Sequence, residues 1–306
     1  MINNSFFSTE ILRWFRENGR ELPWRETRDP YAIWLSEIIL QQTRIAQGWE
    51  YWERFMQTYP HVEDLAAASE DDVLKLWQGL GYYSRARNLH AAARQIVALG
   101  EFPNTLDGIK SLKGVGDYTA AAIGSFAFNL PAAVVDGNVY RVLSRYFGID
   151  TPINSTQGKK EFAALAQSLL PASEAAAYNQ GMMDFGAIQC TPQSPKCLLC
   201  PLAETCEALR SGRVEELPVK NKTVKVKTRH LSYVYIRYKA PALESQVEAE
   251  NYAEAEKHAE AESWIAIHRR GEGDIWQGLW EPYNISDMKE LPSFVKDPIL
   301  LAKDVK

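Results

Sequence analysis

Apolar residues recur every three or four positions along most of the first 220 residues, which is the spacing of one face of an α-helix. Helix start and stop signals punctuate this pattern, such as Asp29-Pro30 at a first turn and Gly100 at a last one. The pattern predicts a mainly α region with helices over residues 9–18, 30–46, 49–58, 69–77, 84–99, 117–126, 137–146, 156–170 and 173–188.

The pattern changes near residue 220. Residues 219–229 are basic and predict a linker that follows a helical domain over residues 1–218. Beyond it, residues 230–238 and 263–268 alternate between apolar and polar positions, as strands do. An insert rich in Glu and Ala occupies residues 244–262. We therefore expect a second, partial α+β domain over residues 230–306.

Length and composition narrow the class of protein. The 306 residues suffice for two domains, and 46% of them are apolar, an ordinary share for a globular chain. No apolar run approaches the ~20 residues of a membrane span, and the N-terminus carries no signal peptide. We expect no membrane partner, and a location in the bacterial cytoplasm or the eukaryotic nucleus. The net charge of −5 argues against binding of nucleic acid through the overall charge of the protein. Any DNA binding must therefore use local positive patches and backbone amides.

All four cysteines fall in one short loop, at Cys190, Cys197, Cys200 and Cys206. Thiolates this close together, with no cysteine elsewhere to pair with, indicate one metal centre rather than a disulfide framework. A structural zinc ion usually takes two short Cys-x2-4-Cys pairs, of which this loop has one. An iron–sulfur cubane accepts wider arcs between its four ligands. The spacing favours the cluster and leaves zinc as the alternative.

Two glycine turns connect predicted helices. Lys113-Gly114-Val115-Gly116 lies inside a helix, turn and helix over about residues 105–127. Its glycines let the backbone approach a ligand, and the free N–H groups of the following helix attract an anion such as a DNA phosphate. An ordinary αα-hairpin is the alternative. The second turn, 79–83, sets Leu80 and Tyr82 before two arginines, and such tips can wedge between bases, although aromatic residues of this kind more often belong to a core.

Two carboxylates have unusual surroundings. Glu37 lies among residues 31–40, which are apolar almost all round and predict burial. Burial raises the pKa of a carboxyl, as a general acid near neutral pH requires; pairing with an arginine is the alternative. Asp136 opens the helix predicted over 137–146, where an Asp commonly caps the helix and stays ionised. One neutral and one charged carboxyl suit the cleavage of a glycosidic bond.

Together these segments resemble the adenine DNA glycosylases of the MutY type, members of the helix-hairpin-helix superfamily that also contains endonuclease III. The segments that carry the resemblance are residues 22–25, 36–43, 79–83, 114–116 and 135–139, with the cysteine loop 190–206. They cover residues 8 to about 210 in order and spacing. The resemblance implies a two-lobed fold with one [4Fe–4S] cluster on the four cysteines. It also implies a monomer that removes adenine mispaired with 8-oxoguanine or guanine from double-stranded DNA.

The resemblance implies a role for each matched residue. Glu37 would protonate the flipped adenine at N7, Asp136 would stabilise the positive sugar, Asn138 would orient Asp136, and Tyr118 would lie beside the sugar. The residues that would line the adenine pocket are Trp24, Arg25 and Gln180; those around the opposite base are Gln42, Thr43, Leu80 and Tyr82; those at the DNA backbone are Lys113, Gly114, Val115 and Gly116.

Departures from the family pattern sharpen the expectation. Bifunctional relatives have a lysine where this chain has Tyr118, so we expect a monofunctional enzyme that leaves the strand uncut. A bifunctional glycosylase/lyase like endonuclease III and a non-catalytic iron–sulfur DNA-binding protein remain the alternatives. The family usually has Leu-Pro-Gly before the hairpin, where this chain has Lys113. Residues 264–270 and 275–281 resemble the first half of a Nudix-like domain, whose loop for 8-oxoguanine would follow Lys306, so we expect weakened discrimination.

Overall fold

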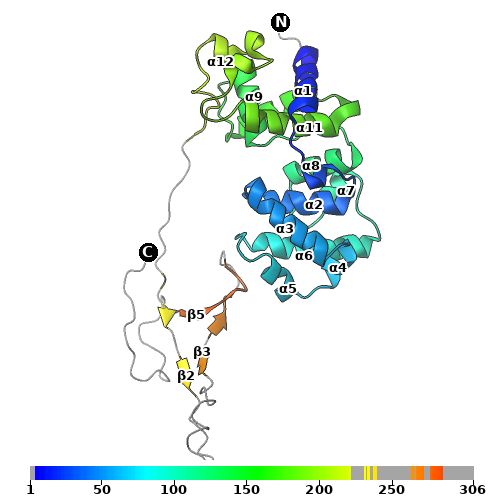
Figure 1. The fold of residues 1–306 in the computed structure, drawn as a ribbon, viewed down its shortest axis with the longest axis vertical. Coiled ribbons are helices and arrows are strands. Elements are labelled where there is room, and N and C mark those ends of the chain that lie inside the picture. Colours follow the sequence, from blue (N-terminus) through cyan, green and yellow to red (C-terminus); the bar gives the residue numbers. More distant parts are fainter. Residues whose placement is uncertain are drawn as a thin grey trace, which may run out of the picture. The chain divides into compact units, whose positions relative to one another are not determined.

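The computed structural model describes residues 4–221 and, of the remainder, residues 231, 233–234, 237–239, 263–265, 267–271 and 276–284. The chain divides into two compact units, Met1–Thr223 and Val224–Lys306. The described part of the first unit is helical, as predicted (Figure 1). Within the described residues, no helix combines the length and apolar character needed to cross a membrane.

The helices of the first unit are α1 (Asn4–Asn18), α2 (Pro30–Leu40), α3 (Ile45–Thr58), α4 (Val62–Ala67), α5 (Glu70–Leu76), α6 (Ser84–Leu99), α7 (Leu106–Lys110), α8 (Asp117–Phe128), α9 (Gly137–Phe147), α10 (Thr156–Leu169), α11 (Ala175–Asp184) and α12 (Glu207–Arg210). A π-helix, Phe185–Gln189, continues α11, and a 3-10 turn, Pro23–Arg25, precedes α2. The sequence pattern missed the short helices α4 and α12.

The helix predicted over residues 30–46 is wrong in its last part. The helix α2 begins as expected, with the Asp29 side chain accepting a hydrogen bond from the Tyr31 amide, but it ends at Leu40. Gln42 adopts a left-handed φ of 57° and breaks the helix without a glycine or proline. The next helix, α3, then starts at Ile45. Apolar residues continue through the break, so hydrophobic periodicity alone could not reveal it.

Two large apolar cores mark two lobes of the helical unit, and a third, smaller cluster contains residues of both, such as Ile33 and Val134. The first lobe packs α2 to α8 around the buried side chains of Trp34, Phe55 and Trp77. The second lobe packs α1 against α9, α10 and α11, and it includes Phe7 and Phe162. Figure 1 shows α1 beside α9 and α11, although the first lobe separates them in the sequence. The second lobe is therefore built from the two ends of the helical segment, and the first lobe from its middle.

The described part of the second unit consists of short antiparallel strands. The strand β5 (Trp280–Asn284) lies between β1 (Tyr233–Val234) and β4 (Ile267–Arg269). A separate pair joins β2 (Arg237–Lys239) to β3 (Ser263–Ile265). The expected strand regions therefore contain strands. Linker residues 222–229, the acidic insert and residues 285–306 lie outside the described residues.

Candidate active site and cysteine loop

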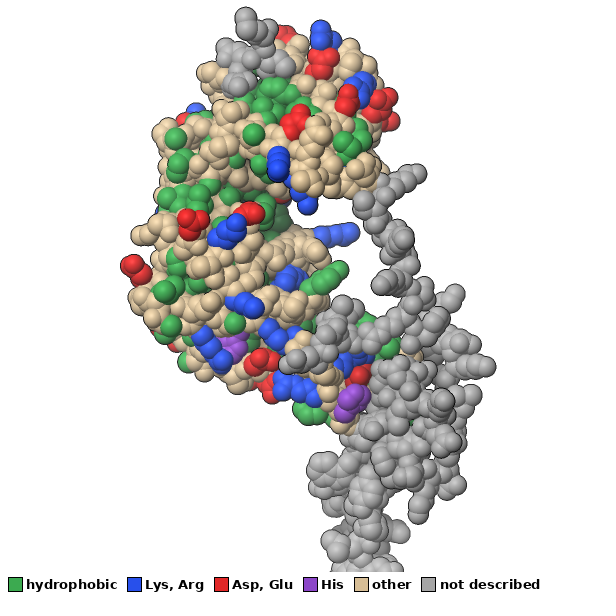
Figure 2. Space-filling model, turned by 180° about the vertical axis from the view of Figure 1, so that it is seen from behind, with side chains coloured by type: hydrophobic (Ala, Val, Ile, Leu, Met, Phe, Trp, Pro, Cys, Tyr) green, Lys and Arg blue, Asp and Glu red, His purple; other side chains and the backbone are tan. Residues whose placement is uncertain are grey.

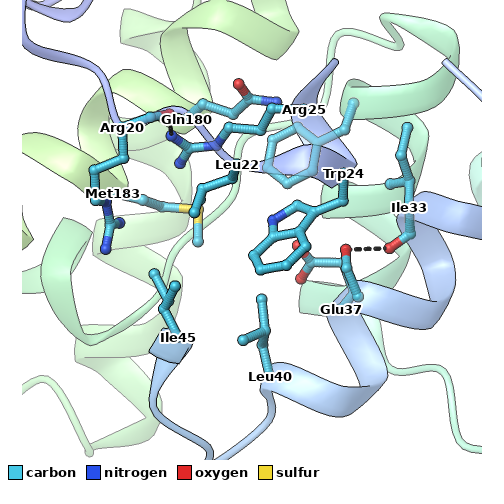
Figure 3. Close-up of a pocket in the computed structure, with 12 residues that line it drawn as sticks. Arg20, Leu22, Trp24, Arg25, Ile33, Glu37, Leu40, Ile45, Gln180 and Met183 are labelled. Atoms are coloured by element: carbon cyan, nitrogen blue, oxygen red, sulfur yellow. Dashed lines mark hydrogen bonds between the residues drawn. The ribbon is translucent and has the colours of Figure 1, made fainter. Parts of the chain in front are cut away.

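Two cavities of the helical unit meet at Glu37. The first encloses about 430 Å³, its open mouth included, and its wall contains Trp24, Arg25 and Gln180. The second encloses about 670 Å³ on the same measure, and its wall contains Asp136. The remaining predicted residues in the second wall are Thr43, Tyr118 and Asn138. In Figure 3, which draws the first cavity, the Trp24 indole lies beside Glu37. The structure thus brings the residues expected around adenine and around the sugar to one place.

Glu37 is buried, as its apolar helix predicted, with 8% of its surface exposed. The pKa of its carboxyl is raised to about 7, because burial and the negative charge of Asp136 raise it more than the charge of Arg25 and a hydrogen bond with Tyr118 lower it. Among the described residues, Glu37 forms no ion pair; Arg25 instead pairs with Asp184 at 2.8 Å. The alternative of an arginine-paired Glu37 is therefore wrong, and the group can hold a proton near neutral pH.

Asp184, which sequence reasoning missed, holds two arginines at the cavity walls. Its side chain has no exposed surface. Both guanidinium nitrogens of Arg25 donate to it, at 2.8 and 2.9 Å, and Arg20 donates its backbone N–H and its Nε at 2.9 Å. Burial alone would raise the pKa of Asp184, but these hydrogen bonds outweigh burial and lower it. The available sequence signal was that Asp184 is the one charged residue of α11, as Glu37 is of α2.

Asp136 caps α9, as its position predicted. Its Oδ1 accepts hydrogen bonds from the Asn138 and Val139 amides, each at 2.8 Å. Its Oδ2 accepts one from the Asn138 side-chain amide at 2.7 Å. Three N–H donors therefore hold this half-buried carboxylate. They also fix its direction toward the second cavity, which Asn138 shares.

Tyr118, in the first turn of α8, joins the site through its hydroxyl. This hydroxyl shares a hydrogen bond with Glu37, and burial together with the charges of Glu37 and Asp136 raises the pKa of the phenol. Tyr118 therefore keeps its proton and acts as a hydrogen-bond donor at neutral pH.

The predicted helix-hairpin-helix is present as α7, the turn and α8. Gly114 has a left-handed φ of 79°, and a Cβ there would lie 2.7 Å from the Asn88 side chain. Gly116 opens α8 without a side-chain cap, so the first N–H groups of α8 are available to an anion. Asp117, at the same end, forms an ion pair with Lys110. Figure 2 shows lysine and arginine side chains around a hollow of the helical unit, as a chain of net negative charge would need for DNA.

The residues expected around the opposite base lie on two loops, and they differ in exposure. Gln42 and Tyr82 both have left-handed φ angles, 57° and 46°, which non-glycine residues rarely adopt. The Tyr82 side chain is 64% exposed. Leu80 is instead 8% exposed and packs in the core of the first lobe. In the structure as it stands, Tyr82 is the projecting tip of its loop and Leu80 is not.

The four cysteines are free and line one cavity of about 330 Å³, its mouth included. Arg145, buried to 3% exposure, donates a hydrogen bond to the Cys190 sulfur at 3.4 Å. Within the described residues, no three Cys, His, Asp or Glu side chains come close enough to hold a single metal ion. Four thiols around one cavity next to a buried cation fit an anionic cluster.

Comparison with protein families gives two matches. Residues 35–171 match the HhH-GPD superfamily of base excision DNA repair proteins. Residues 190–206, which contain all four cysteines, match the iron-sulfur binding domain of endonuclease III. The loop is therefore an iron–sulfur binding loop, and the cofactor is one [4Fe–4S] cluster.

Relatives of known function agree with these matches. The adenine DNA glycosylase of Buchnera aphidicola subsp. Acyrthosiphon pisum is 39% identical over 70% of this chain and 62% of that protein. That of subsp. Schizaphis graminum is 36% identical over 76% of this chain and 68% of that protein. A solved structure of a thermostable thymine-DNA glycosylase is 34% identical, covers 68% of this chain and 97% of its own, and has a TM-score of 0.63. The chain spans only 44% and 41% of the mouse and human adenine DNA glycosylases.

Proposed function

Because this chain belongs to the HhH-GPD superfamily of base excision DNA repair proteins, among the adenine DNA glycosylases, we propose that it hydrolyses the N-glycosidic bond of adenine in double-stranded DNA. The observation that carries the proposal is the junction of two cavities at a protonatable Glu37, with the charged Asp136 in the second cavity. A neutral and a charged carboxyl at one place suit an oxocarbenium-like transition state.

The first cavity would receive the adenine after it leaves the base stack. Trp24 is supported edge-on by Trp49 and Trp52, at 5.9 and 5.7 Å between ring centroids, so its indole offers a firm wall for a flat base. Arg25 and Gln180 supply polar groups to the same wall. Glu37 would then donate its proton to N7 of the base, which makes the base a better leaving group.

The second cavity would hold the deoxyribose. As the glycosidic bond breaks, positive charge develops on the sugar, and the Asp136 carboxylate would stabilise it. Asn138 keeps Asp136 in place through the 2.7 Å hydrogen bond, and Tyr118 lies beside the reacting sugar. Water completes the reaction, and both strands stay intact because Tyr118 carries no amine to form a Schiff base.

The partner is double-stranded DNA, with adenine opposite 8-oxoguanine or guanine. Gln42, Thr43, Leu80 and Tyr82 would surround the opposite base, while Lys113 and the turn Gly114-Val115-Gly116 hold a phosphate. Extrusion of a base costs a few kcal/mol, and less from a mispair, which supplies part of the selectivity. The protein would act as a monomer.

We also propose the assignment of the remaining parts. Cys190, Cys197, Cys200 and Cys206 are the ligands of the [4Fe–4S] cluster. Such a cluster would supply electron-transfer chemistry, which base hydrolysis does not require, and the four cysteines that hold it would tie residues 190–206 together. Residues 1–218 form the glycosylase domain, 219–229 the linker and 230–306 a partial Nudix-like domain.

The test incubates the purified protein with duplexes that hold adenine opposite 8-oxoguanine, guanine or thymine. We expect free adenine from the first two duplexes and strand cleavage only after treatment with alkali. Cleavage without alkali, together with a covalent complex trapped by borohydride, would establish the bifunctional alternative. Binding of the mispairs without release of adenine would establish the non-catalytic one.

A further inference from the structure

One guanidinium gathers main-chain carbonyls from two separate loops. Arg85 lies in the first turn of α6. Its Nη1 donates to carbonyls at the end of α2, and its Nη2 donates to carbonyls of the turn before α6. The acceptors are Ile38 (3.1 Å), Ile39 (3.1 Å) and Gln41 on the first side, and Leu80 (3.2 Å) and Gly81 (3.4 Å) on the second.

These contacts satisfy main-chain carbonyl groups at the C-terminal end of α2. The helix ends at Leu40, and the last carbonyls of a helix have no partner within it. A cation at this end is favourable, and the planar fork of an arginine can serve several acceptors at once. The buried Trp77 backs the guanidinium, 5.1 Å from its ring centroid, and donates its own indole N–H to the Gly81 carbonyl at 3.0 Å.

The two loops that Arg85 joins contain two of the four non-glycine residues that have a left-handed φ among the described residues, Gln42 and Tyr82. Gln42 directly follows a carbonyl bound by Arg85, and so does Tyr82. Left-handed non-glycine residues are strained and persist only where the surrounding structure holds them in place. Arg85 supplies that constraint to both loops, and it ties both to the helix that carries Glu37.

We propose that Arg85 is a positioning residue, which fixes the Gln42 loop and the Tyr82 loop at one separation and thereby couples their entry beside the opposite base to extrusion of the adenine toward Glu37. This inference rests on the proposed function. Arg85 acts through the loop backbones rather than on the reacting atoms, so its loss impairs extrusion and leaves the proton donor unchanged.

The test replaces Arg85 by lysine, which keeps the charge and loses the fork. Two controls lie on the same helix. Arg94→Lys alters another arginine that donates to a main-chain carbonyl, that of Ala66 at 3.2 Å, away from the loops. Ile96→Val removes one methyl group from the core of the first lobe and leaves both loops unchanged.

Three quantities are measured for each protein: the melting temperature, the single-turnover excision rate across pH, and the fluorescence rise of 2-aminopurine substituted for the target adenine. Arg85→Lys should lose about ten- to a hundredfold in rate and most of the fluorescence rise. The midpoint of its pH profile should stay that of the parent. Arg94→Lys should match the parent, and Ile96→Val should melt lower and still extrude the base.

Two outcomes would overturn the proposal. In the first, Arg85→Lys gives the full fluorescence rise. In the second, Ile96→Val loses extrusion as far as Arg85→Lys does at the same melting temperature. If the parent itself releases no adenine, the proposed function fails, whereas the fluorescence comparison among the variants still reports on the loops.

Discussion

The two carboxylates of the site come from different lobes and are held in opposite ways. Glu37 lies in the last turn of an apolar helix of the first lobe, where burial and the charge of Asp136 bring its pKa to about 7. Asp136 lies at the start of a helix of the second lobe, where three N–H donors surround it. One lobe thus raises the pKa of its carboxyl by burial, whereas the other surrounds the same chemical group with N–H donors.

The contrast depends on context rather than on the carboxyls themselves. A position inside α2 deprives a side chain of water, whereas a helix N-terminus offers unpaired N–H groups. Neither lobe alone creates the pair, because the cavity wall that holds Asp136 also contains Glu37 from the other lobe. Substitutions that remove one of the two carboxyls, or that change the pKa of Glu37, therefore test the difference between the two lobes.

The largest effect should follow from removal of the Glu37 carboxyl. Glu37→Gln keeps the shape but cannot donate a proton to the base, so single-turnover excision should fall about 10²- to 10⁴-fold. The pKa of Glu37 is near 4.5 in the unfolded chain and about 7 in the folded protein. Its stabilising contribution is therefore fully present at pH values below about 4.5 and is lost as the pH rises through about 7. Glu37→Gln should therefore be at least as stable as the parent at pH 8. Excision within tenfold of the parent would make Glu37 a structural residue.

Removal of the Asp136 carboxylate should have the next largest effect. Asp136→Asn retains a good helix cap and removes the negative charge, so the protein should fold and lose about 10²- to 10³-fold in excision rate. The charge of Asp136 also raises the pKa of Glu37, so the alkaline limb of the remaining activity should move to lower pH. Circular dichroism and single-turnover kinetics check both points. An unchanged rate would remove Asp136 from the mechanism.

A change in the pKa of Glu37, produced by substitution of Asp184, should have a smaller effect. Asp184→Asn leaves the charges of Arg25 and Arg20 less compensated beside Glu37, which stabilises ionised Glu37 and lowers its pKa. Since the protonated form is active, the fall of excision with rising pH should occur about one unit lower, and lower pH should restore the rate. Rates are normalised to the folded fraction, because breaking a buried pair costs about 3–5 kcal/mol. A uniform loss at every pH would contradict this electrostatic coupling.

The smallest effect should come from Tyr118→Phe. The Tyr118 hydroxyl lowers the pKa of Glu37 through its hydrogen bond, so its removal should raise that pKa and move the alkaline limb upward. At neutral pH we expect a change of no more than about tenfold, because a single hydrogen bond contributes about 0.5–1.5 kcal/mol. A downward shift of the limb would mean that Tyr118 stabilises the protonated form instead.

How much the sequence predicts depends on whether the cause is local. The burial of Glu37 and the cap at Asp136 follow from their own helices, and both are present in the structure. The ion pair between Arg25 and Asp184 could not be predicted, because the two residues lie 159 positions apart in the chain. The end of α2 was missed for a related reason: Arg85, 44 residues beyond Gln41, satisfies the carbonyls that a local C-cap would have served. Leu80 packs in the core, where tertiary contacts rather than the turn sequence decide its exposure.

The position of α1 has a consequence for the order in which the protein can fold during its synthesis. Phe7 and Ile11 are fully buried in the second lobe, and Ser8 donates a hydrogen bond to the Leu169 carbonyl. At roughly 5–20 residues per second, α1 leaves the ribosome about 10 to 30 s before the helices that cover it, while the contiguous first lobe can already fold. A nascent chain therefore exposes the apolar face of α1 until these helices have emerged. It completes the Glu37 and Asp136 pair only after the last helices of the second lobe emerge.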